Sequence, residues 1–112
     1  MDRSGSAPEH RVVLVTAPDV GSAQRIAHSL VEEGLAACVN VIPGLTSIYR
    51  WRGKLEESSE VLLIVKTTST AVGRLIERVR ALHPYEVPEI ISVAVAEGLP
   101  DYLAWLSESV RS

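Results

Sequence analysis

The amino-acid sequence predicts an α+β domain with a ferredoxin-like β-α-β-β-α-β sheet, a long central β-hairpin and an extra C-terminal helix. Short runs of β-branched and apolar residues alternate with stretches in which apolar residues recur every three or four positions. The resulting order is strand, helix, strand, strand, helix, strand, helix, which is two β-α-β halves plus a terminal helix. Right-handed crossovers would place the first and third strands in the centre, with both main helices on one face.

The first strand and helix are marked by a short apolar run and a capping residue. Residues 12–16 are mostly apolar and are followed by Ala17-Pro18-Asp19, so they predict a buried strand. Asp19 can accept hydrogen bonds from the first free amides of a helix. Gly34 supplies the C-terminal stop of that helix. Its apolar stripe consists of Ala23, Ile26, Ala27, Leu30 and Val31.

The middle of the chain predicts the hairpin. Residues 36–42 and 45–51 are rich in strand-forming residues, and Pro43-Gly44 between them indicates an edge strand or a bulge. A turn at Arg52-Gly53-Lys54 leads to a strand at residues 60–67, which is apolar on both faces. An arm of about 14 residues would extend about 46 Å, whereas a compact chain of this length has a radius of gyration of about 13 Å. The hairpin is therefore expected to overhang the domain.

The outer arm of the hairpin predicts self-association. It carries Leu45, Ile48, Tyr49 and Trp51 where a free strand edge usually carries charge. Either the tip folds back over its own domain, or the hairpin pairs with neighbouring subunits. The second alternative is favoured because cyclic closure would satisfy every edge, and three copies form the natural small ring. Tyr49 and Trp51 are the predicted hairpin contacts of a homotrimer.

The second half of the chain repeats the pattern of strand and helix. Ser69 or Thr70 can cap a helix that ends at His83-Pro84, because the residue before proline is disfavoured in a helix. Residues 89–96 predict a strand, and Pro100 suits the first turn of a final helix at 101–110. The stripe of the second helix is Val72, Leu75, Ile76, Val79 and Leu82, and the inward residues of the strand are Ile91, Val93 and Val95.

Domain boundaries and composition restrict the function. Residues 1–10 predict a disordered leader, and residues 11–112 predict the domain. Hydrophobic residues make up 46% of the 112 residues and the net charge is -3, which argues against binding of nucleic acid or anionic lipid. The leader has no signal-peptide core, no apolar run is long enough to span a membrane, and a lone Cys38 fits a reducing compartment. A cytoplasmic protein is expected.

Catalytic motifs are not found in the sequence. No segment matches a phosphate loop, a nucleophile elbow or a paired-carboxylate active site. A role other than that of an enzyme is therefore expected.

Six sequence strings, in this order, resemble the CutA (divalent-cation-tolerance) family over about residues 12–110. They are Val15-Thr16-Ala17-Pro18-Asp19, Leu35-Ala36-Ala37-Cys38-Val39-Asn40, Tyr49-Arg50-Trp51-Arg52-Gly53-Lys54, Lys66-Thr67-Thr68, His83-Pro84-Tyr85-Glu86-Val87-Pro88-Glu89 and Tyr102-Leu103-Ala104-Trp105-Leu106. The resemblance implies a ferredoxin-like fold, a homotrimer held through the hairpin strands, no catalytic activity, and a cytoplasmic bacterial role in tolerance of copper and other divalent cations. The trimer architecture of this family also resembles that of PII-type signalling proteins, so a small-molecule sensor with ligands between subunits is the alternative.

The resemblance implies a place for metal ligands. In one branch of the family, copper is bound by a cysteine at the end of the first strand and two adjacent histidines before Pro-Tyr; these positions are Val15, Leu82 and His83 here. His83, with Glu86 and Glu89, is the candidate cation site, and the alternative is a histidine that hydrogen-bonds a carbonyl at the helix end. No cofactor is required on this interpretation. Copper or another divalent cation would be weakly bound.

Two further groups of residues are candidates for binding. Lys66 and Tyr85 predict an anionic-ligand cleft between subunits; the alternative is an ion pair of Lys66 with Glu86 or Glu89 that joins the subunits. Cys38, in a strand of small apolar residues, is expected to act as a small hydrophobe more than as a thiolate ligand. His10 and His28 are expected to be solvated.

Overall fold

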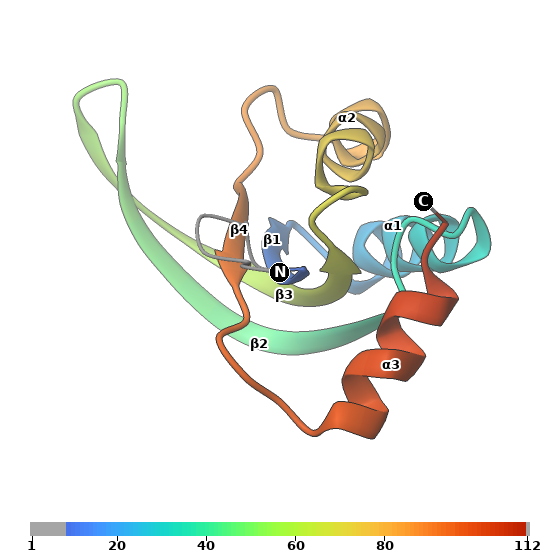
Figure 1. Cartoon of the computed structure of the whole chain (residues 1–112). Helices are drawn as coiled ribbons and strands as arrows, with labels where there is room; N and C mark the ends of the chain where they lie inside the picture. Colours follow the sequence, from blue (N-terminus) through green and yellow to red (C-terminus); the bar gives the residue numbers. More distant parts are fainter. Residues whose placement is uncertain (1–8, 112) are drawn as a thin grey trace.

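The computed structural model describes residues 9–111, and its elements follow the predicted order (Figure 1). Residues 1–8 lie outside the described part, so the disordered leader stays a prediction there. The first strand begins at His10, whose ring bonds the Ser107 hydroxyl at 2.8 Å, so the expectation that His10 is solvated is wrong. The elements are β1 His10–Ala17, α1 Val20–Glu32, β2 Cys38–Trp51, β3 Lys54–Thr68, α2 Val72–Leu82, β4 Ile90–Ala94 and α3 Pro100–Ser109.

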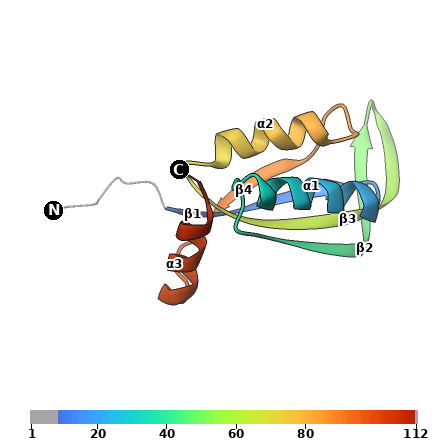
Figure 2. The same ribbon diagram turned by 90° about the vertical axis from the view of Figure 1, so that its right-hand side faces the viewer.

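The sheet is antiparallel throughout, with strand order β2-β3-β1-β4. The first and third strands are therefore central, as predicted, and the fold is ferredoxin-like α+β. Helices α1 and α2 lie side by side on one face of the sheet (Figure 1). Helix α3 lies at the end of the sheet where β1 begins, far from the hairpin tip (Figure 2). There Leu106 of α3 packs with Ala71 and Ala37.

Local signals set the boundaries of α1. The carboxylate of Asp19 accepts a hydrogen bond from the backbone amide of Ser22 at 2.7 Å, which confirms Asp19 as the N-cap. Hydrogen bonds from Ser22 hold the pKa of Asp19 below its usual value. After the helix, Gly34 has a φ of +74°, a conformation that costs glycine little. The carbonyl of Gly34 accepts from the amide of Arg111 at 2.8 Å, so the end of α1 is tied to the end of the chain.

The covered face of the sheet, under α1 and α2, holds the core. Val13 and Val15 of β1 and Leu63 and Val65 of β3 are fully buried there. They pack against the apolar stripes of the two helices, including Ile26, Leu30, Leu75 and Val79. Burial of a side chain of this size contributes about 1.5–3 kcal/mol. The core therefore needs no second copy of the chain.

The prediction for β4 was wrong in its inward face and its length. Ile90, not Ile91, packs on the core, and the strand ends at Ala94. Because Ile90 pairs with the buried Val15, Ile91 must point to the opposite face. There Ile91 and Val93 are 50% and 49% exposed. We call this side of the sheet the open face.

The start of α2 also differs from the prediction. Neither Ser69 nor Thr70 caps the helix; its N-cap residue is Ala71, which makes no side-chain cap bond. The hydroxyls of Thr68 and Thr70 instead bond each other at 3.2 Å. Ala71 is fully buried in the contact with α3, so tertiary packing decides where this helix begins.

Strands β2 and β3 form a hairpin that overhangs the domain, as predicted. The molecule measures 52 Å along its longest axis and its radius of gyration is 15.1 Å, above the ~13 Å of a compact chain. The hairpin curves away from the sheet, and its tip approaches the loop that follows α2 (Figures 1 and 2). An ion pair of 3.6 Å joins Arg52 at the tip to Glu86 in this loop. The tip therefore contacts its own domain through a pair of largely exposed side chains.

Pro43-Gly44 produces the predicted bulge. Ile42 pairs with Leu62 and Leu45 pairs with Glu60, so β2 advances three residues while β3 advances two. One extra residue in β2 changes which of its side chains face a given side. Beyond the bulge, Tyr49 and Trp51 therefore share a face with Glu60.

Candidate functional site

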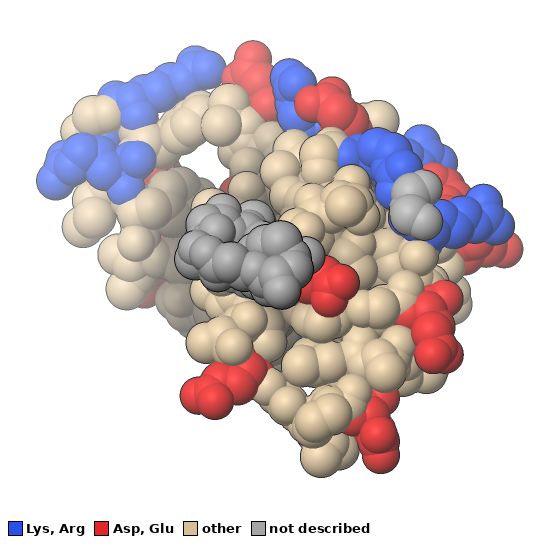
Figure 3. Space-filling view, viewed as in Figure 1, with Lys and Arg blue, Asp and Glu red and all other residues tan. Residues whose placement is uncertain are grey.

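A hollow of about 570 Å³ lies between the hairpin and the loop after α2. It is visible in the space-filling view as an opening beside the hairpin tip (Figure 3). The elements around it come from three separate parts of the sequence. Its lining consists of three aromatic residues, three glutamates and four smaller residues, namely Tyr49, Trp51, Tyr85, Glu60, Glu86, Glu89, Thr16, Ser47, Ile48 and Val87.

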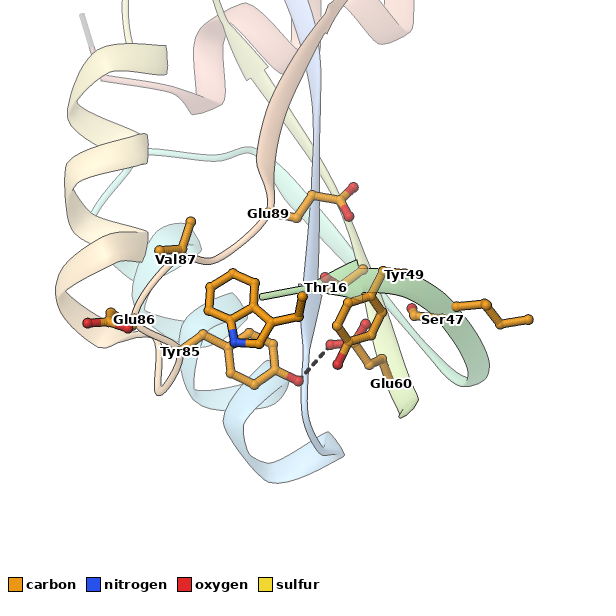
Figure 4. A pocket seen from close by; sticks show the side chains of 10 residues that line it. Thr16, Ser47, Tyr49, Glu60, Tyr85, Glu86, Val87 and Glu89 are labelled. Atoms are coloured by element: carbon orange, nitrogen blue, oxygen red, sulfur yellow. Dashed lines mark hydrogen bonds between the residues drawn. The ribbon is translucent and has the colours of Figure 1, made fainter. Parts of the chain in front are cut away.

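Tyr85 and Glu60 form the best-defined contact in the hollow. The Tyr85 hydroxyl donates a hydrogen bond to Oε2 of Glu60 at 2.6 Å, shown as the dashed line in Figure 4. Burial and this hydrogen bond raise the pKa of Tyr85 far above its usual value. The phenol therefore stays protonated at neutral pH and acts as a donor. It satisfies one carboxylate oxygen of Glu60, a residue that is only 8% exposed.

His83 contacts Tyr85 through a backbone hydrogen bond and through its ring. The backbone amide of Tyr85 donates to Nδ1 of His83 at 3.0 Å, so Nδ1 acts as an acceptor. Nε2 lies 2.7 Å from the carbonyl oxygen of Thr16 and therefore carries the ring proton and donates. The two rings also lie 4.9 Å apart between centroids. The structure thus places His83 at a carbonyl, as the alternative interpretation of this residue proposed.

The candidate cation ligands are not gathered at one point. Across residues 9–111, no group of three or more His, Cys, Asp or Glu side chains lies close enough to hold one metal ion. Both ring nitrogens of His83 are occupied, and Glu86 pairs with Arg52. Of the other two positions that the resemblance associates with copper, Val15 lies in the core and Leu82 packs against it. Metal binding through His83, Glu86 and Glu89 stays a prediction.

Lys66 and Tyr85 are not brought together within one protomer. Lys66 lies on the open face, where its ammonium group bonds Oδ1 of Asn40 and approaches Sγ of Cys38 at 3.7 Å. It does not line the hollow. Cys38 is half-buried. A cleft that uses both Lys66 and Tyr85 would require a second copy of the chain.

Tyr49 and Trp51 were predicted as assembly contacts, and the structure also places them in the hollow. The Tyr49 hydroxyl bonds the Ser58 hydroxyl at 2.9 Å, across the hairpin. The guanidinium of Arg52 lies 5.4 Å from the centre of a Trp51 ring, within cation–π range. Sequence reasoning missed the part that Glu60 plays in this site. The signal was present, since Glu60 stands directly before the apolar strand residues Val61 and Leu62.

Fold and site together define a ferredoxin-like α+β protein with an overhanging hairpin and an aromatic, acidic hollow beneath it. A model of the family described as "CutA1 divalent ion tolerance protein" matches residues 11–109. The chain belongs to this family. The family description names a tolerance protein and no reaction.

Individual relatives agree with this assignment. "Divalent-cation tolerance protein CutA" of Thermus thermophilus is 59% identical over 98 residues, which is 88% of this chain and 95% of that protein. The solved structure of the divalent cation tolerance protein from the same organism superposes with a TM-score of 0.90 and 57% identity, covering 91% of this chain and 99% of that one. "Protein CutA homolog" of Xenopus laevis is 56% identical over 96 residues, 86% of this chain, which spans only 64% of that longer relative.

A further structure bears on cellular location. It is described as "Periplasmic divalent cation tolerance protein CutA" from Archaeoglobus fulgidus and has a TM-score of 0.88 and 39% identity, covering 91% of this chain and 99% of that one. Among the described residues, no helix of this chain is long and apolar enough to cross a bilayer.

Proposed function

We propose that this protein is a cytoplasmic homotrimer that serves, without catalysis, in tolerance of copper and other divalent cations and binds such cations weakly. The observation that carries the proposal is the family match over residues 11–109, with relatives named for divalent-cation tolerance. The cytoplasmic location rests on the sequence, whereas one relative of known structure is described as periplasmic. Fractionation of cells that express the natural full-length chain would test the location.

The proposed trimer is supported by apolar residues that the protomer leaves uncovered. Ile91 and Val93 on the open face, and Ile48 and Leu55 on the hairpin, are exposed. Exposed large apolar side chains on the sheet and on the hairpin are typical of an interface. The number three comes from the family resemblance and from cyclic closure.

Light scattering tests the assembly. Trp51→Glu should lower the mass because it places a charge in a hairpin contact. Val31→Glu, at an exposed apolar position of α1, is the matched control and should keep the mass. An unchanged mass for Trp51→Glu would contradict the role of the hairpin in assembly.

Calorimetric titration with copper and with zinc tests the cation-binding part. We expect a weak heat of binding that falls several-fold in Glu86→Gln/Glu89→Gln, because carboxylate oxygens are lost. Glu32→Gln, on α1, is the matched control. Absence of both heat and any shift in melting temperature for the unaltered protein would remove direct cation binding.

A PII-like small-molecule sensor is the second candidate function, and the hollow favours it. A volume of about 570 Å³ lies in the range of small-molecule sites. Lys66 of a neighbouring copy would supply the cationic part of the predicted cleft with Tyr85. Lys66→Met should then weaken anion binding to the trimer and leave its mass unchanged, whereas unaltered anion binding would count against this cleft.

A further inference from the structure

We propose that the hollow beneath the hairpin binds an organic ammonium cation. This inference rests on the small-molecule binding of the second candidate function, but it assigns a cation to the hollow itself, whereas the cleft with Lys66 of a neighbouring copy would take an anion. Two residues of the hollow, Trp51 and Glu89, also belong to the proposed hairpin contact and the proposed cation site. Three aromatic rings and three carboxylates line the hollow, and no Lys or Arg is among its lining residues. Aromatic faces and carboxylates together recognise alkylammonium groups in proteins.

The most buried carboxylate in the hollow is incompletely satisfied. Oε2 of Glu60 accepts from Tyr85, whereas Oε1 has no hydrogen-bond partner among the described residues. Glu60 as a residue is only 8% exposed, and Oε1 is left to accept a hydrogen bond or a cation from the hollow. The pairing with Tyr85 leaves the negative charge in place, because the phenol keeps its proton. A cation in the hollow would pair with this carboxylate.

The spacing of the carboxylates favours an organic cation over a metal ion. A divalent cation needs several oxygen ligands within about 2.0–2.6 Å. In the described part of the chain, no three acidic or metal-binding side chains converge on one point. Glu60 and Glu89 instead lie apart in the hollow, with Tyr49 beside them (Figure 4). An ammonium group with alkyl substituents can contact both the aromatic rings and the carboxylates.

At the edge of the hollow, the chain already pairs an organic cation with an aromatic ring and a carboxylate. The guanidinium of Arg52 lies 5.4 Å from a Trp51 ring centre and 3.6 Å from Oε1 of Glu86. An organic cation held by an indole and a glutamate is therefore present already, supplied by the hairpin tip. Arg52 and Glu86 are both largely exposed, so this internal pair is weak. A ligand would compete with Arg52 or occupy the other face of Trp51.

Choline and its uncharged carbon isostere, 3,3-dimethylbutanol, provide the test. The two have nearly the same shape and differ in charge. We expect choline to shift the Tyr85 amide and Trp51 indole signals of the ¹⁵N-labelled full-length protein and to saturate at millimolar concentration. The isostere should bind at least about fivefold more weakly, the size of a cation–π contribution. Equal binding of both, or no saturation by choline, would overturn the proposal.

Matched variants locate the site. Trp51→Leu should weaken choline binding about fivefold, whereas Trp105→Leu should not; the two tryptophans are 43% and 45% exposed. Glu60→Gln keeps an acceptor for Tyr85 and removes the charge, so it should weaken binding several-fold. Glu89→Gln, at an exposed position, should weaken binding in the same direction even if Glu60→Gln is poorly folded. Equal effects of Trp51→Leu and Trp105→Leu would place the ligand elsewhere and overturn the proposal.

A substitution that strengthens binding is also expected. Arg52→Asn removes the internal cation and suits the φ of +51° at this position. Choline should then bind about twofold to threefold more tightly, whereas weaker binding would contradict competition at Trp51.

Light scattering with and without choline separates a free ligand from a neighbouring subunit. An unchanged mass supports a free small cation. A fall in mass would indicate that choline displaces a cationic side chain of another copy, and it would overturn the proposal. Anion binding tested with Lys66→Met, and the copper and zinc titrations, use other ligands with the same protein, so failure of choline binding is distinguishable from failure of the proposed functions.

Discussion

The two faces of the sheet carry similar apolar side chains and reach opposite degrees of burial. Val13, Val15, Leu63 and Val65 are fully buried beneath α1 and α2, whereas Ile91 on the open face is half exposed. Hydrophobic burial depends on removal from water and not on residue type alone. The covered face is complete within one chain. The open face and the hairpin leave large apolar side chains exposed. Assembly and ligand binding are therefore both proposed there.

The largest effect on the stability of the protomer is expected on the covered face. Leu63→Ala removes a fully buried side chain and should lower the free energy of unfolding by about 2–5 kcal/mol. Denaturant titration followed by circular dichroism measures this change. Because the cavity lies within one protomer, a loss of less than about 1 kcal/mol would contradict the contrast between the faces.

On the open face, a charge should affect assembly more than the fold. Ile91→Asp places a carboxylate at a half-exposed position of β4, so the protomer should keep its far-ultraviolet circular dichroism spectrum. If this face joins three copies, the mass from light scattering should fall about threefold, because an unpaired buried charge opposes association. Ser92→Asp, beside it, is exposed but faces the helix side of the sheet and serves as the control. An unchanged mass for Ile91→Asp would contradict a role of the open face in assembly.

Tyr85 lies where the covered domain meets the hairpin, and an intermediate effect is expected. Tyr85→Phe deletes the donor to Glu60 and should lower the free energy of unfolding by about 1–3 kcal/mol. Thermal and denaturant unfolding at neutral pH measure this loss. No loss would show that water replaces the phenol without cost.

The pH dependence of Tyr85 provides a second measurement. Its raised pKa means that folded protein keeps the phenolic proton at pH values where the unfolded chain, with a pKa near 10.0, loses it. This contribution to stability is complete below pH 10 and is lost as the pH rises further. Stability above pH 10 should therefore fall more steeply in the unaltered protein than in Tyr85→Phe. Parallel curves would contradict the raised pKa.

The smallest effect is expected at the far end of the hairpin. Leu55 is 73% exposed, so Leu55→Ala should change the unfolding free energy of the protomer by less than about 0.5 kcal/mol. Comparison of this variant with Leu63→Ala, in the same strand, isolates burial from residue type. A loss of several kcal/mol at low protein concentration would show that the tip packs within its own chain.

Much of the fold is predictable because the signals are local. The cap at Asp19, the stop at Gly34 and the bulge at Pro43-Gly44 each depend on neighbouring residues. The strand order was predictable from the right-handed crossover connections. The inward face of β4 was not predictable, because Ile90 and Ile91 are both apolar and only pairing with Val15 distinguishes them. The start of α2 was decided by the contact with α3, which the sequence around Ser69 does not contain.

The candidate site was less predictable than the fold. The sequence singled out His83, Tyr85 and Trp51, but not the hollow in which two of them meet. Its walls combine segments separated by tens of residues, and the bulge decides which side chains of β2 face Glu60. Simple alternation from Cys38 onward would have placed Trp51 on the wrong side. The hydrogen bonds of His83 likewise depend on Thr16, 67 residues away.

The single extra residue at Pro43-Gly44 also restricts how the hairpin can change over evolutionary time. Loss of one residue of β2 between the bulge and the turn would reverse the faces of the β2 residues beyond it. Tyr49 and Trp51 would leave the hollow together in one event. Loss of a cross-strand pair, one residue from each arm, would also exchange the faces near the tip, whereas loss of two such pairs would preserve them. Viable changes in hairpin length are therefore expected in steps of two residues per arm, so that the tip lengthens or shortens by whole pleats.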